Sequence, residues 1–435
     1  MCERGVRFYV HCVIARALEV QRHRPRLPND WLLATRQRRK LTRLTRFGGL
    51  MVKYRTFGSL NWQVSALGFG AMRMPIIGGD RSHINEQEAI RMIRSAIDHG
   101  VNYIDTTYPY HGGHSEIVVG KALQRWYREK VKLATKMPSW LITSREDMQR
   151  IFEEQLTKLQ TPFVDFYLLH GLRKPRWPSL LNNKVFDWAE QEMRKGRIKH
   201  LGFSFHDDYR FFKEIIDAYD GWTLCQIQYN YIDTEYQAGT QGLKYAASKG
   251  LAVVVMEPLQ GGILAHTPPH AIQHIWNQAE TKRTLVDWAL QWLWNQPEVS
   301  VVLSGMSTLR QVTENLASAN RSGINTLTEN EIGLIAQVRE KYLEVGYIGC
   351  TGCRYCVPCP EDVAIPEILA LYNAHHIQRG DTKTQKGIID RYFTTVGEEN
   401  RADKCVSCGE CEEKCPQHLP IRNLVTRATR TFRQE

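Results

Sequence analysis

Residues 101–113 read VNYIDTTYPYHGG and combine a short apolar segment with a polar end. Val101–Asp105 has the length of a buried strand, and the preceding Glu86–His99 has the apolar periodicity of an amphipathic helix. The same pairing of strand and helix recurs along residues 51–345. The further strand candidates are Ala66–Met72, Val131–Thr135, Phe163–His170, His200–Ser204, Cys225–Tyr229, Leu251–Met256 and Val299–Ser304. Further helix candidates are Arg145–Leu159, Val185–Lys195, Tyr209–Ala218, Leu285–Asn295 and Thr308–Asn320.

Eight strand–helix units over this length predict an α/β protein with a (β/α)8 TIM barrel at residues 51–345. The competing architecture is an open, doubly wound sheet. That fold usually carries a Gly-x-Gly-x-x-Gly turn after a strand, and Gly68-Phe-Gly70-Ala-Met is an incomplete match. The barrel is therefore the favoured prediction.

Four polar residues lie at the carboxyl ends of three predicted strands or just beyond them: Asp105, Tyr110, Lys136 and His170. In a barrel these ends meet on one face, where the chemistry of the fold is found. Tyrosine has an ordinary pKa near 10, and a neighbouring ammonium group such as that of Lys136 lowers it. We expect Tyr110 to act as a proton donor, with Asp105 holding Lys136 in place. His170 is expected to donate a hydrogen bond to a carbonyl oxygen.

These positions resemble the catalytic tetrad of the aldo-keto reductase family. The matching segments are residues 102–113, Ala134-Thr-Lys136 and Tyr167-Leu-Leu-His170. The resemblance extends over about residues 53–345. It implies an NAD(P)H-dependent oxidoreductase that reduces an aldehyde or ketone to an alcohol. The whole chain is similar to the members of this family that carry a C-terminal two-cluster 4Fe-4S domain.

The resemblance also implies nucleotide-binding positions, and these match the family less well: Ser204, Gln226, Met256, Ser307, Arg310, Gln311 and Asn315. Ser204 and Gln226 match residues that bind the nicotinamide carboxamide. At the position where the family has a further carboxamide-binding Asn, this chain has Phe205. Met256 replaces the aromatic residue that stacks on the nicotinamide, and simple core packing is its alternative role.

The 2′-phosphate clamp of the family is missing, because Gln311 stands at its Arg position. Arg310 is one place away, and Ser307 could offer a helix N-terminus to a phosphate group. Glu314 and Asn315 match the adenine-side pair of the family. The cofactor is thus expected to be NADP or NAD.

Eight of the eleven cysteines lie in two runs near the C-terminus: Cys350, Cys353, Cys356 and Cys359, then Cys405, Cys408, Cys411 and Cys415. The second run has the C-x2-C-x2-C-x3-C-P spacing of bacterial ferredoxins, and the first is one residue shorter before its last cysteine. Two zinc sites are the alternative, but they do not explain three cysteines at i, i+3 and i+6 in both runs.

Two 4Fe-4S clusters are therefore expected in a small, mainly helical ferredoxin-like domain at residues 346–435. In two-cluster ferredoxins the fourth ligand of each cluster comes from the other run. Cys415 is then expected to complete the cluster of the first run, and Cys359 that of the second.

The net charge of +11 is concentrated in residues 1–50, which hold 12 of the 57 Lys and Arg residues and 3 of the 46 Asp and Glu residues. Residues 1–50 are expected to be a disordered basic extension, with Met51 as a natural start. The nearly neutral remainder argues against nucleic-acid binding. No apolar run is long enough to span a membrane, and a cytoplasmic location is expected.

The sequence thus predicts a carbonyl reductase with a small-molecule carbonyl substrate, and the segment Gln260–Arg283 is expected to form part of its pocket. A redox protein is a possible partner of the clusters. The alternative is a nucleotide-sensing or docking barrel in an electron-transfer complex, with the iron–sulfur domain as its working part. Nucleotide oxidation with a panel of carbonyl compounds separates the two.

Overall fold

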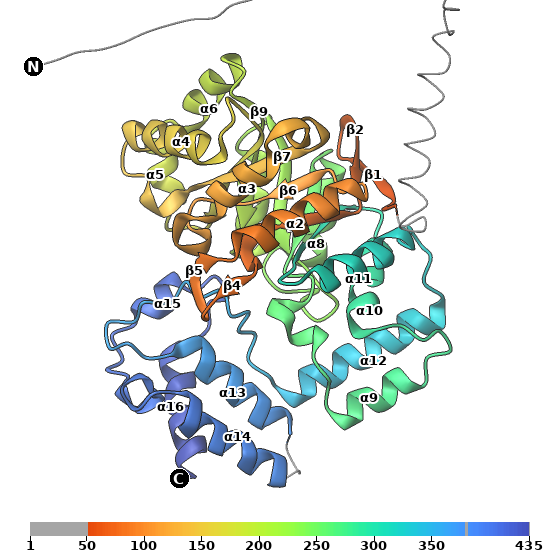
Figure 1. The fold of residues 1–435 in the computed structure, drawn as a ribbon, viewed down its shortest axis with the longest axis vertical. Coiled ribbons are helices and arrows are strands. Elements are labelled where there is room, and N and C mark those ends of the chain that lie inside the picture. The colour runs from red at the N-terminus through yellow and green to blue at the C-terminus, as the bar shows by residue number, and fades with distance from the viewer. Residues whose placement is uncertain (1–50, 379–381, 435) are drawn as a thin grey trace, which may run out of the picture. The chain divides into compact units, whose positions relative to one another are not determined.

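The computed structural model describes residues 51–378 and 382–434. The predicted basic extension at residues 1–50 lies outside the described residues. Eight parallel strands close into a barrel in the order β10-β11-β12-β3-β6-β7-β8-β9, surrounded by helices (Figure 1). The barrel strands are β3 (Leu67–Gly70), β6 (Tyr103–Asp105), β7 (Lys132–Pro138), β8 (Val164–Leu172), β9 (Ile198–Phe205), β10 (Trp222–Gln228), β11 (Ala252–Met256) and β12 (Val299–Gly305).

The predicted TIM barrel is confirmed, and each of the eight predicted strands corresponds to one barrel strand, with ends that differ by a few residues. The helices between Glu86 and Val345 are α2 (Glu86–Asp98), α3 (Ser115–Leu123), α4 (Arg145–Leu159), α5 (Trp177–Asn182), α6 (Val185–Arg194), α7 (Tyr209–Asp217), α8 (Gly239–Ser248), α9 (His270–Asn277), α10 (Leu285–Trp294), α11 (Leu309–Asn320) and α12 (Glu329–Val345). Local signals set their ends. Ser144 and Asp147 form a capping box at the start of α4, and Gly346 ends α12 in the left-handed conformation.

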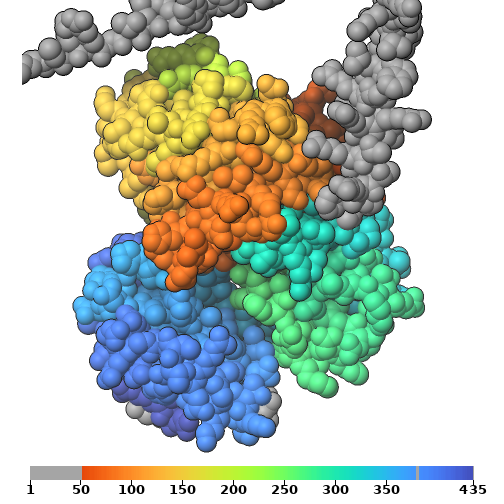
Figure 2. All heavy atoms as spheres, in the orientation of Figure 1, coloured from red at the N-terminus to blue at the C-terminus, as the bar shows by residue number. Residues whose placement is uncertain are grey.

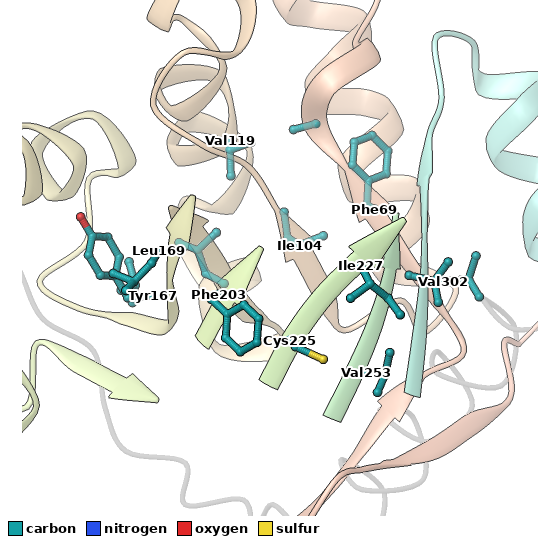
Figure 3. Close-up of a cluster of buried hydrophobic side chains, with 14 of the residues drawn as sticks. Phe69, Ile104, Val119, Tyr167, Leu169, Phe203, Cys225, Ile227, Val253 and Val302 are labelled. Atoms are coloured by element: carbon teal, nitrogen blue, oxygen red, sulfur yellow. The ribbon is translucent and has the colours of Figure 1, made fainter. Parts of the chain in front are cut away.

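Side chains alternate along the barrel strands between two hydrophobic layers. One layer fills the barrel interior and includes Tyr103, Ala134 and Leu168. The other lies between the strands and the helices, and Figure 3 shows Phe203 of β9 and Val119 of α3 within it. This alternation decides which residues at the strand ends face the interior.

Two antiparallel hairpins were not predicted: β1 (Tyr54–Phe57) with β2 (Leu60–Ser65), and β4 (Ile76–Ile77) with β5 (Asp80–Ile84). Phe57 of the first hairpin is fully buried against Phe166, with ring centroids 4.8 Å apart. This contact joins the hairpin to the core inside the barrel. Such long-range packing leaves little signal in a short local pattern.

The C-terminal region, hereafter the tail (residues 347–434), contains α13 (Ile365–Ile377), α14 (Thr382–Thr395), α15 (Glu410–Lys414) and α16 (Ile421–Arg433). The helices enclose a separate hydrophobic core that includes Ile368, Val425 and Phe432. The predicted mainly helical character is confirmed. Figure 2 shows the tail in blue, and hydrogen bonds described below join it to the barrel. No helix of the described residues is both long and apolar enough to cross a membrane.

Candidate active site

The strand alternation carries three of the predicted residues to the same end of the barrel interior. On β6, Asp105 lies two positions after Tyr103, whose side chain is in the barrel interior. On β7, Lys136 lies two positions after the interior residue Ala134. Because side chains two positions apart on a strand share a face, both charged groups face the interior. His170 follows Leu168 on β8 in the same way.

Tyr110 begins the short 3₁₀ turn Tyr110–Gly113 that comes after β6. Its side chain and those of Asp105, Lys136 and His170 line one cavity of about 140 Å³. The structure thus brings the four predicted catalytic residues together.

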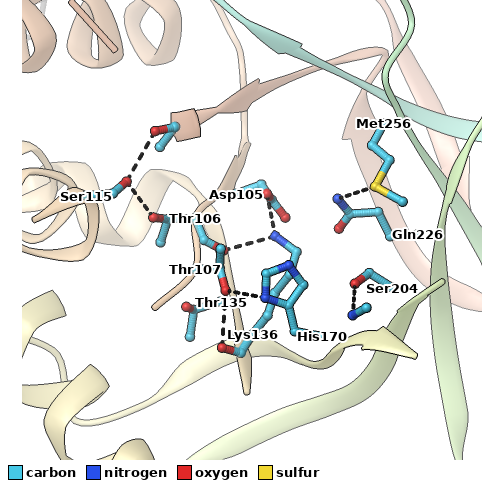
Figure 4. Close-up of polar contacts among 12 residues, drawn as sticks. Asp105, Thr106, Thr107, Ser115, Thr135, Lys136, His170, Ser204, Gln226 and Met256 are labelled. Atoms are coloured by element: carbon cyan, nitrogen blue, oxygen red, sulfur yellow. Dashed lines mark hydrogen bonds and ion pairs between the residues drawn. The ribbon is translucent and has the colours of Figure 1, made fainter. Parts of the chain in front are cut away.

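Asp105 and Lys136 form a fully buried ion pair at the base of this cavity (Figure 4). Lys136 Nζ lies 2.6 Å from Asp105 Oδ1 and donates a second hydrogen bond to the Thr106 carbonyl at 3.0 Å. Burial raises the pKa of Asp105 and lowers the pKa of Lys136, and the ion pair opposes both shifts. Breaking a buried pair of this kind typically costs about 3–5 kcal/mol of folding free energy.

Tyr110 differs from the expectation in its acidity. Burial raises the pKa of its phenol well above the usual value, and the negative charge of Asp105 adds to the shift. Lys136 Nζ lies 5.7 Å from the centre of the Tyr110 ring, and its charge is already balanced by Asp105. The predicted lowering of this pKa by Lys136 is therefore wrong for this structure, and Tyr110 is a protonated phenol at neutral pH.

His170 is held by contacts on both sides of its ring. Its Nδ1 lies 3.1 Å from Thr107 Oγ1, and the Trp140 ring packs beside it with centroids 5.0 Å apart. Burial and the charge of Lys136 lower the pKa of His170 well below its usual value, so the imidazole is neutral. The Thr107 hydroxyl also lies 3.3 Å from the Lys136 carbonyl, to which it can donate its one proton. When this hydroxyl donates to Nδ1 instead, the single ring proton lies on Nε2.

Three of the predicted nucleotide-binding residues line the same cavity: Ser204, Gln226 and Met256. Ser204 Oγ accepts a hydrogen bond from the Gly171 amide, which leaves its hydroxyl proton available to donate. Gln226 Oε1 is buried and has no hydrogen-bond partner among residues 51–378 and 382–434, while its Nε2 contacts the Met256 sulfur at 3.7 Å. An unpartnered buried amide oxygen fits a site that pairs with a carboxamide. Phe205 instead packs in the core against Phe212.

The other four predicted nucleotide-binding residues are not in the lining of this cavity. The Ser307 amide donates to Gln311 Oε1, and the Ser307 hydroxyl donates to the Arg73 carbonyl. Arg310 is exposed and paired with Glu314. Asn315 is buried and donates to Ser304 Oγ, so its side chain serves the packing of α11 on β12. The backbone N–H groups of Ser307 and Gln311, at the start of α11, thus already donate hydrogen bonds within the protein.

Sequence reasoning missed several residues of the cavity, notably Arg73 and Glu257. It also assigned too much of the segment 260–283 to the pocket. Gly261 and Gly262 line the cavity, whereas most of the rest forms α9, which packs against α12. Gly261 and Gly262, which come soon after the end of β11, were the signal for this part of the cavity that the sequence offered. Glycine lets a ligand approach the backbone closely.

The tail also contributes to the cavity, which sequence reasoning did not predict. Thr351, Cys353 and Tyr355 line it from the first cysteine run, and Pro416 and Gln417 line it from the residues after the second run. No local pattern marks these residues as part of a site on a different domain.

The eight tail cysteines lie around two further cavities. One is lined by Cys350, Cys353, Cys356 and Cys415, and the other by Cys359, Cys405, Cys408 and Cys411, with Cys356 touching both. Within residues 51–378 and 382–434, no three His, Cys, Asp or Glu side chains are close enough to hold a single metal ion. A cluster of four irons spreads its thiolates further apart than one tetrahedral zinc ion does, so the two groupings fit clusters.

Comparison with known proteins agrees with this geometry. The Aldo/keto reductase family matches residues 66–340, and the 4Fe-4S dicluster domain matches residues 349–419. The chain belongs to the aldo/keto reductase family of oxidoreductases and carries a ferredoxin-type domain after the barrel.

Individual relatives cover the barrel. L-galactose dehydrogenase of Arabidopsis thaliana is 26% identical over 66% of this chain and 95% of its own length. NADH-specific methylglyoxal reductase of Escherichia coli is 25% identical over 60% of this chain and 92% of its own length. Among solved structures, an aldo-keto reductase from Klebsiella pneumoniae in complex with NADPH is 26% identical, with a TM-score of 0.53 over 66% of this chain and 95% of its own.

Proposed function

We propose that the protein reduces an aldehyde or ketone to an alcohol with NADH or NADPH, and that Tyr110 donates the proton. The observation that carries the proposal is the single cavity in which Tyr110, Lys136 and His170 face Ser204, Gln226 and Met256. NADPH in the Klebsiella pneumoniae relative, and the NADH named for the Escherichia coli reductase, support a nicotinamide nucleotide as the cofactor.

A nicotinamide nucleotide bound in the cavity would supply a hydride to the carbonyl carbon. Ser204 and Gln226 would hold its carboxamide through the free hydroxyl proton and the unpartnered amide oxygen described above. Met256, beside Gln226 on the wall, would cover one face of the ring.

The side chains on the substrate side act on the carbonyl oxygen. Neutral His170 donates a hydrogen bond from Nε2 and orients the carbonyl, and Tyr110 transfers its proton to the same oxygen as negative charge develops there. The resulting phenolate lies near Lys136, whose ammonium is held in place by Asp105. The raised pKa of Tyr110 keeps this proton available before the reaction.

Steady-state oxidation of NADH and NADPH with a panel of aldehydes and ketones tests the proposal. Turnover that depends on the carbonyl compound is expected. Tight nucleotide binding without turnover of any compound would instead support a sensing or docking barrel whose working part is the iron–sulfur domain.

The rate of reduction is expected to vary little with pH. The pKa of His170 is lowered, so its ring binds a second proton only at a pH well below the ordinary histidine pKa near 6.5. The pKa of Tyr110 is raised, so its phenol loses its proton only above about pH 10. Values of kcat/KM, with a deuterated nucleotide to identify hydride transfer, should stay level from about pH 6 to pH 9. A loss centred near pH 7 would contradict these assignments.

NADH is expected to serve at least as well as NADPH. Arg310 is exposed and paired with Glu314, and Gln311 bonds to the Ser307 amide, so α11 presents no preformed cationic clamp for a 2′-phosphate. Competing kcat/KM values for the two nucleotides measure the preference. A hundredfold preference for NADPH would mean that Arg310 leaves Glu314 to bind the phosphate.

The cysteines are proposed to hold two 4Fe-4S clusters. We assign Cys350, Cys353, Cys356 and Cys415 to one, hereafter the proximal cluster, because its ligand loop reaches the active-site cavity. Cys405, Cys408, Cys411 and Cys359 are assigned to the other, hereafter the distal cluster. The grouping of the cysteines around two cavities supports this crossed arrangement.

A further inference from the structure

Tyr355 brings a hydroxyl group from the tail into the active site of the barrel. It lies between Cys353 and Cys356, and it lines the cavity that holds Tyr110, Lys136 and His170. Its hydroxyl oxygen is 3.5 Å from His170 Nε2, the nitrogen that faces the substrate in the proposed mechanism. Its ring centroid lies 6.4 Å from that of His170 and 6.0 Å from that of Trp140, which packs on the same histidine.

The position of Tyr355 is fixed by contacts on both sides of the cavity. On one side, Arg73 donates a hydrogen bond of 2.7 Å to the Thr351 carbonyl, four residues before Tyr355. A Cβ placed on Gly261 would collide with the backbone of Thr351, so the barrel loop and the first cysteine run touch without space between them.

On the other side, the residues after Cys415 bind the barrel. Gln417 Nε2 donates to Gln228 Oε1 in a buried bond of 2.7 Å, and Tyr236 donates to the Gln417 carbonyl at 2.6 Å. Gln237 donates to the Pro416 carbonyl at 2.9 Å. Tyr355 is therefore part of a built wall rather than of a loose loop.

The chemistry of a carbonyl group limits what this hydroxyl can do. A carbonyl oxygen accepts two hydrogen bonds along its lone pairs, and the proposed mechanism assigns these to Tyr110 and His170. A third donor next to His170 is therefore best placed to bond a second oxygen of the substrate. This oxygen would be attached to the carbon next to the carbonyl carbon. An apolar substituent there would place no hydrogen-bond partner beside the half-buried Tyr355 hydroxyl, which costs free energy.

We propose that Tyr355 is a specificity-determining residue that hydrogen-bonds this second oxygen, so that the enzyme prefers α-hydroxy or α-oxo carbonyl compounds. The inference rests on the proposed function and names its substrate class. The proximal cluster would also have a structural part in substrate recognition, because Cys353 and Cys356, on either side of Tyr355, are proposed ligands of that cluster.

Tyr355→Phe tests the proposal with two ketones of nearly equal size, hydroxyacetone and butanone, which differ by a hydroxyl in place of a methyl group. In the wild type, kcat/KM should be higher for hydroxyacetone. The variant should lower this value about threefold to tenfold for hydroxyacetone, mainly through KM, and should not lower that for butanone. Binding of propane-1,2-diol, compared with butan-2-ol, to the protein with oxidised nucleotide should weaken in parallel, measured by tryptophan fluorescence.

Tyr372→Phe is the matched control, because Tyr372 is a buried tyrosine of α13 in the tail core and does not line the cavity. It should leave both values of kcat/KM unchanged, and iron content should be equal in all three proteins. An equal loss for both ketones in Tyr355→Phe, or no loss for either, would overturn the proposal and leave the proposed function standing. A wild type that turns over neither ketone nor any other carbonyl compound would overturn both.

Discussion

Tyr110→Phe is expected to lower kcat for carbonyl reduction about 10²–10⁴-fold, the usual contribution of a positioned acid. The substitution removes the proton donor and keeps the ring, which packs edge-on against His170 with centroids 6.4 Å apart. The dissociation constants of NADH and NADPH should change little, because Ser204, Gln226 and Met256 are untouched. Single-turnover rates and nucleotide fluorescence titrations measure the two quantities separately.

Tyr108→Phe is the control for this loop. The Tyr108 hydroxyl donates to Glu154 at 2.6 Å, away from the cavity, so its loss should affect kcat by less than about twofold. If Tyr110→Phe reduces ketones at the wild-type rate, another group supplies the proton and the assignment of Tyr110 is wrong.

Protein prepared without oxygen is expected to hold about eight irons per chain, since two 4Fe-4S clusters use all eight tail cysteines. Cys408→Ser should lose about half of this iron. Cys225→Ser should lose none, because Cys225 is buried between the barrel strands and the helices. Iron, zinc and acid-labile sulfide analysis gives the counts, and zinc without iron in undamaged protein would contradict the clusters.

Double variants test the crossed arrangement of the ligands. Cys359 and Cys408 line the same cavity, so Cys359→Ser with Cys408→Ser should still leave the proximal cluster and about four irons. Cys359→Ser with Cys353→Ser should disturb both clusters. If each cluster took its four ligands from one run, the two results would be exchanged.

The barrel and its catalytic residues could be predicted because both depend on local patterns. Each strand is a short apolar run, and the period of two along β6, β7 and β8 places Asp105, Lys136 and His170 on the interior face. The crowding of cysteines likewise predicted the ferredoxin-type domain, which the family comparison confirms.

Other features depend on how distant parts of the chain pack. The hydrogen bond from Gln417 to Gln228 joins residues far apart in sequence, and neither residue belongs to a motif. The acidity of Tyr110 also follows from burial, which outweighs the single neighbour that a sequence pattern could suggest. The positions carried over from the family on α11 have local partners in this chain, and their role in nucleotide binding stays a prediction.

The contact between Gly261 and Thr351 has a consequence for how the two domains can diverge. Gly261 has a φ of +67° and its missing side chain leaves room for the tail backbone. A side chain at position 261 would require the tail to move away from the barrel. A change of shape in the first cysteine run would likewise have to fit against the backbone of this barrel loop. Natural variation at residue 261 should therefore be tied to variation in the tail, and exchange of tails between relatives should succeed only where both surfaces are exchanged together.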